Sequence, residues 1–270
     1  MRRLLIRPGG IGDCVLSLPA LELLKTDYTE VWVRGDVVPL VRFADQVCSI
    51  ASTGLDLLGL PEVDPPPGLV DRLRSFDSIV SWYGSNREPL VAAMQSLGVP
   101  VQFLAALPPA GERIHAADFF LRQAGSSAIA APRIDCGEVT RGEFAVIHPF
   151  SGSARKNWPM DRFRELARRL PAPVQWCAGP DDWLQDAVRI ENLYELAQWL
   201  SAARIYIGND SGITHLAAAA GGRVVAIFPA TDPALWGPRG ERVRIVSGGL
   251  DEIGADQVFD AVCRLLEASE

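Results

Sequence analysis

Paired cysteines and long apolar runs are both missing from this sequence of 270 residues. Its five cysteines are scattered and odd in number and nowhere form CxxC. That argues against a disulfide framework or a cysteine zinc site and favours free thiols in a reducing compartment. The most apolar window, 213–230, holds His215 and Arg223 and is broken by Gly-Gly, so we expect no transmembrane helix. The first apolar stretch ends at Arg7 and Pro8, too early for a signal peptide. We therefore expect a cytoplasmic protein.

An excess of positive charge is missing as well. The sequence has 26 Lys and Arg against 33 Asp and Glu, a formal net charge of −7. This balance argues against nucleic acid as the main partner, because phosphate backbones favour basic surfaces. With 48% hydrophobic and 22% charged residues, the chain has the composition of a folded protein. Its length suits one large α/β unit or two domains.

The two halves of the chain begin alike, each with a strand, a small-residue loop and a helix. We predict the first strand at 4–7 with a helix from about Asp13, and the second strand at 144–148 with a helix from about Pro159. Strands alternating with helices indicate parallel sheets. The turn-rich stretch 125–143 is the best boundary. The prediction is an α/β protein of two doubly wound domains facing across a cleft. Further elements are expected as strands near 30–34, 46–51, 77–82, 173–179, 204–208 and 223–228 and helices near 86–97, 112–124, 192–203 and after Asp210.

Three loops follow predicted strands, where ligands of open parallel sheets bind. The first, "PGGIGD", contains Gly10, Gly12 and Asp13. Its glycines allow a ligand close to the backbone, and Asp13 stands at the start of a helix. The alternative is an N-capping aspartate after a tight turn.

The second loop, "HPFSGSARKNWP", combines hydroxyls, a glycine and two cations before a helix. Ser151, Ser153 and backbone N–H groups can bind phosphate oxygens, with Arg155 and Lys156 supplying positive charge. The alternative is a solvated basic loop.

The third loop, "GNDSGITH", precedes an alanine-rich helix. Asp210 or Ser211 can cap this helix, and Gly212 leaves room for an anion against its free N–H groups. His215 lies four residues after Ser211 and so on the same helix face. The alternative is a structural histidine.

Several common motifs are missing. Neither GxGxxG nor GxxxxGK[ST] occurs, which argues against a nicotinamide-dependent Rossmann enzyme and against a Walker site. The acidic pair near the phosphate loops, Asp181 and Asp182, is more simply a turn.

Taken together, the loops resemble the family-9 glycosyltransferases, whose best-known members are the ADP-heptose:lipopolysaccharide heptosyltransferases. The matching segments are "RPGGIGDCVLSLPAL", "IHPFSGSARKNWP", "GNDSGITHLAAAAG" and "VVAIFPATDPALWGP", in the expected order over nearly the whole chain. The resemblance implies a GT-B fold. It implies an acceptor-binding domain at 1–138, a nucleotide-sugar-binding domain at 139–250, and a last helix at 251–270 that packs back on the first domain.

The resemblance also assigns residues. Asp13 and Lys156 are expected to be catalytic, with Asp13 as general base, and Gly10 and Gly12 to form the acceptor-side loop. No metal or other cofactor is expected. The donor-binding residues would be Ser151, Gly152, Ser153, Lys156, Asp210, Ser211, Gly212, His215, Thr231 and Asp232.

The function implied is an inverting, metal-independent transfer of a sugar, by resemblance a heptose from ADP-heptose, to a lipopolysaccharide-type or other glycan acceptor. Contact with the inner face of the cytoplasmic membrane would be transient, because the acidic chain shows no basic amphipathic helix. The alternative is a non-catalytic nucleotide-binding relative with a trimmed acceptor domain.

Overall fold

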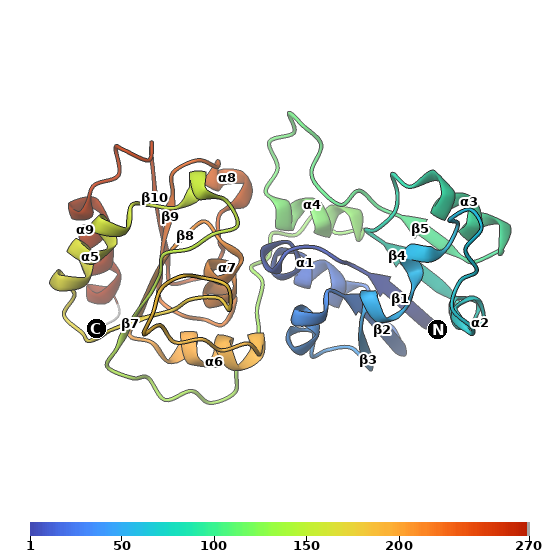
Figure 1. Ribbon diagram of the computed structural model, residues 1–270, viewed down its shortest axis with the longest axis horizontal. Helices are drawn as coiled ribbons and strands as arrows, with labels where there is room; N and C mark the ends of the chain where they lie inside the picture. Colours follow the sequence, from blue (N-terminus) through green and yellow to red (C-terminus); the bar gives the residue numbers. More distant parts are fainter. Residues whose placement is uncertain (269–270) are drawn as a thin grey trace.

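The computed structural model describes residues 1–268 as two α/β halves lying side by side (Figure 1). Each half is built on a five-stranded sheet whose neighbouring strands all run parallel. The strands are β1 (Arg2–Ile6), β2 (Tyr28–Val33), β3 (Gln46–Ser49), β4 (Ser78–Ser81) and β5 (Val101–Phe103) in the first sheet, and β6 (Ala145–His148), β7 (Val174–Trp176), β8 (Ile205–Asn209), β9 (Val224–Phe228) and β10 (Val243–Ser247) in the second.

The connections are helical. The α-helices are α1 (Ile11–Leu23), α2 (Leu69–Arg74), α3 (Glu88–Ser96), α4 (Ala116–Gln123), α5 (Met160–Arg169), α6 (Leu193–Ala202), α7 (Gly212–Ala219), α8 (Pro233–Trp236) and α9 (Ala255–Glu267). The 3-10 turns are η1 (Gly35–Leu40), η2 (Ile50–Ser52), η3 (Leu55–Leu57) and η4 (Ala154–Lys156). No described helix is long and apolar enough to cross a membrane.

Strand order fixes where a ligand can bind. The sheets run β3-β2-β1-β4-β5 and β10-β9-β8-β6-β7, so the order reverses at β1 in one and between β6 and β8 in the other. In doubly wound sheets, a crevice opens at the carboxyl ends of the strands where the order reverses. The loops after β1, β6 and β8 are the three that the sequence singled out.

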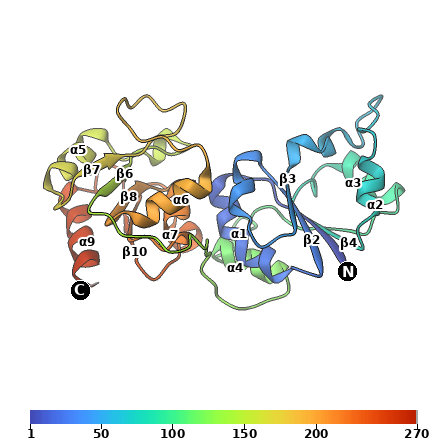
Figure 2. The same cartoon turned by 90° about the horizontal axis from the view of Figure 1, so that it is seen from below.

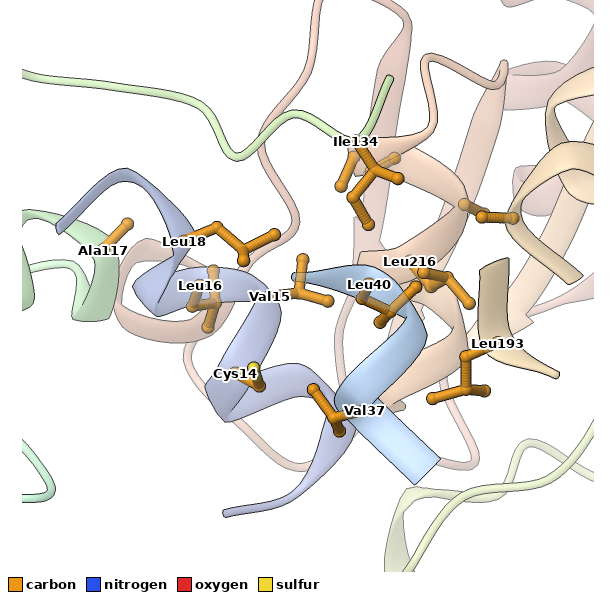
Figure 3. Packing of buried hydrophobic residues seen from close by; sticks show 14 of the residues in the cluster. Cys14, Val15, Leu16, Leu18, Val37, Leu40, Ala117, Ile134, Leu193 and Leu216 are labelled. Carbon is orange, nitrogen blue, oxygen red and sulfur yellow. The ribbon is translucent and has the colours of Figure 1, made fainter. Parts of the chain in front are cut away.

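A shared hydrophobic core joins the halves. One cluster of buried side chains includes residues of α1, α4 and η1 from the first half and of α6 and α7 from the second. Figure 3 shows Val15 and Leu18 of α1 and Leu40 of η1 in this cluster together with Leu216 of α7. Two further clusters cover the outer faces of the sheets. The inner helices therefore form one packed layer between the sheets, which Figure 2 shows from below.

The first turns of α1 and α7 meet at two glycines. A Cβ atom at Gly212 would lie 2.7 Å from Ile11 Cβ and 2.9 Å from Gly12 N. A Cβ atom at Gly12 would lie 3.1 Å from His215 Cδ2. The contacts at Gly212 leave no room for a side chain, so glycine is required there for the two helix N-termini to touch, whereas at Gly12 the His215 ring would have to shift by a few tenths of an ångström.

Polar contacts reinforce the joint between the halves. His115, at the start of α4, accepts a hydrogen bond at Nδ1 from Ala117 N–H, so its Nε2 carries the proton and donates to Gly237 O at 2.9 Å. Asp118 and Arg239 form a two-pronged ion pair across the same joint, and each side chain is 22% exposed.

The last helix corrects an expectation. The sequence analysis placed 251–270 back on the first domain, whereas α9 packs on α5, β9 and β10 of the second half; residues 269–270 lie outside the described residues. Only a short segment separates β10 from α9, and the apolar face of Val258, Val262 and Leu265 completes the outer core of the second sheet. Arg169 of α5 pairs with Asp256 at 2.7 Å and fixes the helix further.

We predict that Gly212→Ala destabilises the protein by about 1–3 kcal/mol, because the new methyl group must push α1 away from α7. The better helix propensity of alanine does not offset that clash. Urea unfolding measures the change. Gly152→Ala is the matched control, since its Cβ position meets nothing within 4 Å and its φ is ordinary. Equal unfolding midpoints for Gly212→Ala and wild type would contradict the close approach.

Candidate functional site

A pocket of about 570 Å³ lies where the two halves meet. The first half contributes Gly10, Ile11, Gly12, Asp13, Leu16 and Arg34. The second half contributes His148, Phe150, Ser151, Gly152, Lys156, Asp182, Asp210, Ser211, Gly212, Ile213, His215, Thr231 and Trp236. The structure thus brings together the residues singled out from sequence in the three loops and Thr231, but not Ser153, Arg155 or Asp232.

The loop after β1 holds Asp13 in place. Asp13 lies in the first turn of α1, and its Oδ2 accepts a hydrogen bond from Gly10 N–H at 3.1 Å. The N-cap residue of α1 is therefore Gly10 and not Asp13, which bonds back to the cap from the third position of the helix. The side chain also lines the pocket, so its carboxylate is available to a ligand there.

Behind this loop lies an arginine that the sequence analysis did not single out. Arg7 is only 2% exposed, and its guanidinium stacks over the Phe120 ring at 4.5 Å and donates to Pro8 O at 3.2 Å. Burial lowers the pKa of Arg7, while the nearby Asp13 raises it. Its positive charge lies beneath the pocket floor on the side of Asp13.

The loop after β8 begins α7 with a side-chain cap. Ser211 Oγ accepts the N–H of Thr214 at 3.3 Å, and the Thr214 hydroxyl bonds in turn to Tyr206 OH at 3.0 Å. Asn209 is fully buried and braces the loop by accepting from Trp158 N–H and donating to Pro149 O. This network fixes the first turn of α7, whose N-terminal N–H groups face the pocket. A helix N-terminus favours an anion.

Asp210 orients the single lysine of the site. Lys156 Nζ lies 2.8 Å from Asp210 Oδ2, and the Thr231 hydroxyl donates to the same oxygen. The Asp210 side chain is 6% exposed and that of Lys156 is 32% exposed. The buried carboxylate is therefore held by its partners and anchors Lys156, whose remaining donors can reach a ligand.

The loop after β6 is partly structural. Ser151 Oγ bonds to Asn157 Oδ1 at 2.7 Å and accepts from Ser153 N–H at 3.3 Å. Ser153 supports this turn from outside the pocket, and Arg155 is exposed away from it. Asp232 is likewise outside, where it caps α8 through Ala234 N–H at 2.9 Å. Position in a motif thus marked the right loops but did not separate lining residues from supporting ones.

Two histidines line the pocket in the neutral form. Burial lowers the pKa of His148 to about 4 and that of His215 to about 4. The Nδ1 atom of each is buried with no hydrogen-bond partner in the described part of the chain. His215 packs against Gly12 of the opposite half, so it has the structural role considered from sequence as well as a place in the pocket.

The sequence analysis also missed Arg34, His148, Phe150 and Trp236. Arg34 and His148 follow or end strands β2 and β6, so a polar residue at the carboxyl end of a parallel strand was the signal that could have found them. Phe150 and Trp236 carry no such signal, because apolar residues at those places also suit a core.

Comparisons with known proteins show which folds and sequences this chain is similar to. Residues 190–266 match the sequence model of glycosyltransferase family 9 (heptosyltransferase). A search of curated protein sequences gave no significant match.

Similar solved structures cover the whole chain. Heptosyltransferase WaaC of E. coli with ADP has a TM-score of 0.74 at 16% identity and covers 98% of this chain and 100% of its own. The ADP-heptose lipopolysaccharide heptosyltransferase II of E. coli has a TM-score of 0.75 at 16% identity, covering 100% and 99%. A family-9 glycosyltransferase of Veillonella parvula has a TM-score of 0.77 at 16% identity, covering 99% and 97%.

These findings confirm the GT-B fold predicted from sequence and the resemblance to glycosyltransferase family 9. The family model that matches residues 190–266 is that of the heptosyltransferases, the family that the loops resemble.

We predict that the buried histidines make stability pH-dependent. They are neutral when folded but titrate near pH 6.5 when unfolded, so the unfolded chain takes up protons first as the pH falls. Stability is therefore lost as the pH falls from about 6.5 towards 4, by on the order of 2 kcal/mol per histidine at pH 5. Urea unfolding from pH 7 to pH 5 should show a shallower slope for His148→Asn than for wild type. Equal slopes would contradict the burial of a neutral His148.

Proposed function

We propose that this protein is an inverting, metal-independent glycosyltransferase. It moves a sugar, a heptose, from a nucleotide-diphosphate donor to a lipopolysaccharide-type or other glycan acceptor. One observation carries the proposal. Asp13 of the first half and Lys156 of the second line the same pocket, at the point where the N-termini of α1 and α7 meet. The pocket thus combines a carboxylate from the first half with a cation and a helix N-terminus from the second.

The second domain, 139–250, would hold the donor. Lys156 and the first N–H groups of α7 supply positive charge, which suits the diphosphate. A nucleotide-diphosphate ligand is supported by the similar structures, since two structures of E. coli heptosyltransferase WaaC are described as being with ADP and with ADP-2-deoxy-2-fluoro heptose. We infer ADP-heptose as the donor of this chain on the same ground. The first domain, 1–138, would hold the acceptor next to Asp13.

The chemistry follows from that placement. The acceptor hydroxyl loses its proton to the Asp13 carboxylate as its oxygen attacks the anomeric carbon of the sugar. The bond from that carbon to the diphosphate oxygen breaks at the same time, on the opposite face of the sugar, so the configuration inverts. General-base assistance of this kind contributes typically about 10²- to 10⁴-fold.

The leaving diphosphate gains negative charge as that bond breaks. Lys156, oriented by Asp210, and the amides at the start of α7 would stabilise that charge without reorganising. These groups take the place that a divalent ion has in other transferases, which is why we propose a metal-independent reaction. The sugar transfer would take place in the cytoplasm. When the acceptor is a glycolipid, the protein would contact the inner face of the cytoplasmic membrane transiently.

We predict that Asp13→Asn lowers kcat by about 10²- to 10⁴-fold, because the amide cannot take the proton. The amide oxygen can still accept the Gly10 N–H bond, so folding and nucleotide affinity should persist. Sugar transfer from ADP-heptose and calorimetric binding of ADP measure the two effects. Asp45→Asn is the matched control, since Asp45 Oδ2 likewise accepts a backbone N–H, from Thr29 at 2.8 Å, away from the pocket.

Normal turnover by Asp13→Asn would remove the proposed base. The same assay is run in excess EDTA, where wild-type turnover should continue; strict dependence on added Mg²⁺ or Mn²⁺ would contradict the metal-independent account. ADP binding by wild type without sugar transfer to any acceptor would favour the non-catalytic alternative.

A further inference from the structure

An exposed indole stands at the rim of the pocket on the second half. Trp183 is 63% exposed, and it follows directly after Asp182, which lines the pocket. Its ring meets the Phe150 ring edge to face, with centroids 5.8 Å apart, and Phe150 also lines the pocket. A large aromatic ring beside a pocket offers a flat face on which a bound ligand can stack.

The loop that carries Trp183 is rigidly built. The Arg189 guanidinium donates to Gly179 O, Asp182 O and Leu184 O at 3.2, 2.9 and 2.6 Å. Asp182 Oδ2 accepts Gly179 N–H at 2.7 Å and closes the turn. Trp183 therefore lies on a loop that is held in place by hydrogen bonds from Arg189 to its carbonyl groups.

The two ends of the pocket differ in what they can bind. The end near Trp236 is tied to the first half, the half that carries Asp13, through the hydrogen bond between His115 and Gly237 O. The sugar, whose anomeric carbon must face Asp13, belongs at that end. The nucleoside lies on the other side of the diphosphate, so it extends along the carboxyl ends of β6 and β7.

That other end suits a nucleoside better than a phosphate. Asp182 carries a negative charge there, which repels phosphate oxygens and accepts hydroxyl groups. The His148 ring and the Phe150 ring, 6.2 Å apart, form an uncharged wall beside it. The flat base of a nucleotide bound in this direction would extend past Phe150 and contact the indole of Trp183.

We propose that Trp183, supported by Phe150, is the platform on which the nucleobase of the donor stacks. This inference rests on the proposed function and adds to it a residue that sets how tightly the base is held. Stacking of a base on an aromatic side chain tolerates any base, and purines offer the larger face. The platform therefore favours a purine nucleotide over a pyrimidine one.

Calorimetry on the full-length protein tests the inference with two probes, ADP and inorganic pyrophosphate. Trp183→Ala should weaken ADP binding by roughly 10- to 100-fold and leave pyrophosphate binding unchanged. Trp183→Phe should restore most of the ADP affinity, because an aromatic face is all that stacking needs. Leu107→Ala, another exposed apolar side chain, 55% exposed and away from the pocket, is the matched control and should bind both probes as wild type does.

Each other outcome overturns the inference in its own way. Unchanged ADP affinity in Trp183→Ala means that no base stacks there, and the proposed function still stands. Equal losses for ADP and pyrophosphate mean that Trp183 only shapes the loop. If wild type binds none of ADP, GDP and UDP, the proposed function fails together with the inference.

Discussion

The contact between the first turns of α1 and α7 is the constraint on which the rest of the structure depends. Gly12 and Gly212 bring two helix N-termini from different sheets against each other, at distances that admit no Cβ atom at Gly212 and only a crowded one at Gly12. Around this contact, a single hydrophobic core continues from one half into the other (Figure 3). The pocket exists because both helices begin at the same place.

The contact also sets the electrostatics of the pocket. Two helix N-termini and Lys156 bring positive potential to one point, and the buried Arg7 adds a further charge from beneath. The carboxylate nearest that charge from the second half, Asp210, is held by Lys156 and Thr231. Asp13 approaches from the other half. An anion is therefore attracted to the second half while the Asp13 carboxylate belongs to the first, the division that the proposed inverting sugar transfer requires.

Much of this could be predicted from the sequence, for identifiable reasons. Buried parallel strands read as apolar runs followed by small or polar loops, so β1, β6 and β8 and their loops were evident. β5 and β10 were not predicted, because the three residues of β5 give too short a pattern and the polar residues of edge strand β10 break the apolar run. The apolar face of α9 could be predicted from the sequence, but the sheet on which this face packs could not. The roles of Trp183 and Arg189 could not be predicted, because only the folded structure shows that the loop after β7 lies at the pocket.

The most direct test of the account is a crystal structure of the protein with ADP. The account predicts that diphosphate oxygens lie within hydrogen-bond distance of the amides of Gly212 and Ile213 and of Lys156 Nζ, with the Asp13 carboxylate on the facing wall. A diphosphate bound away from the meeting point of α1 and α7, or with no contact to either the α7 amides or Lys156, would contradict it.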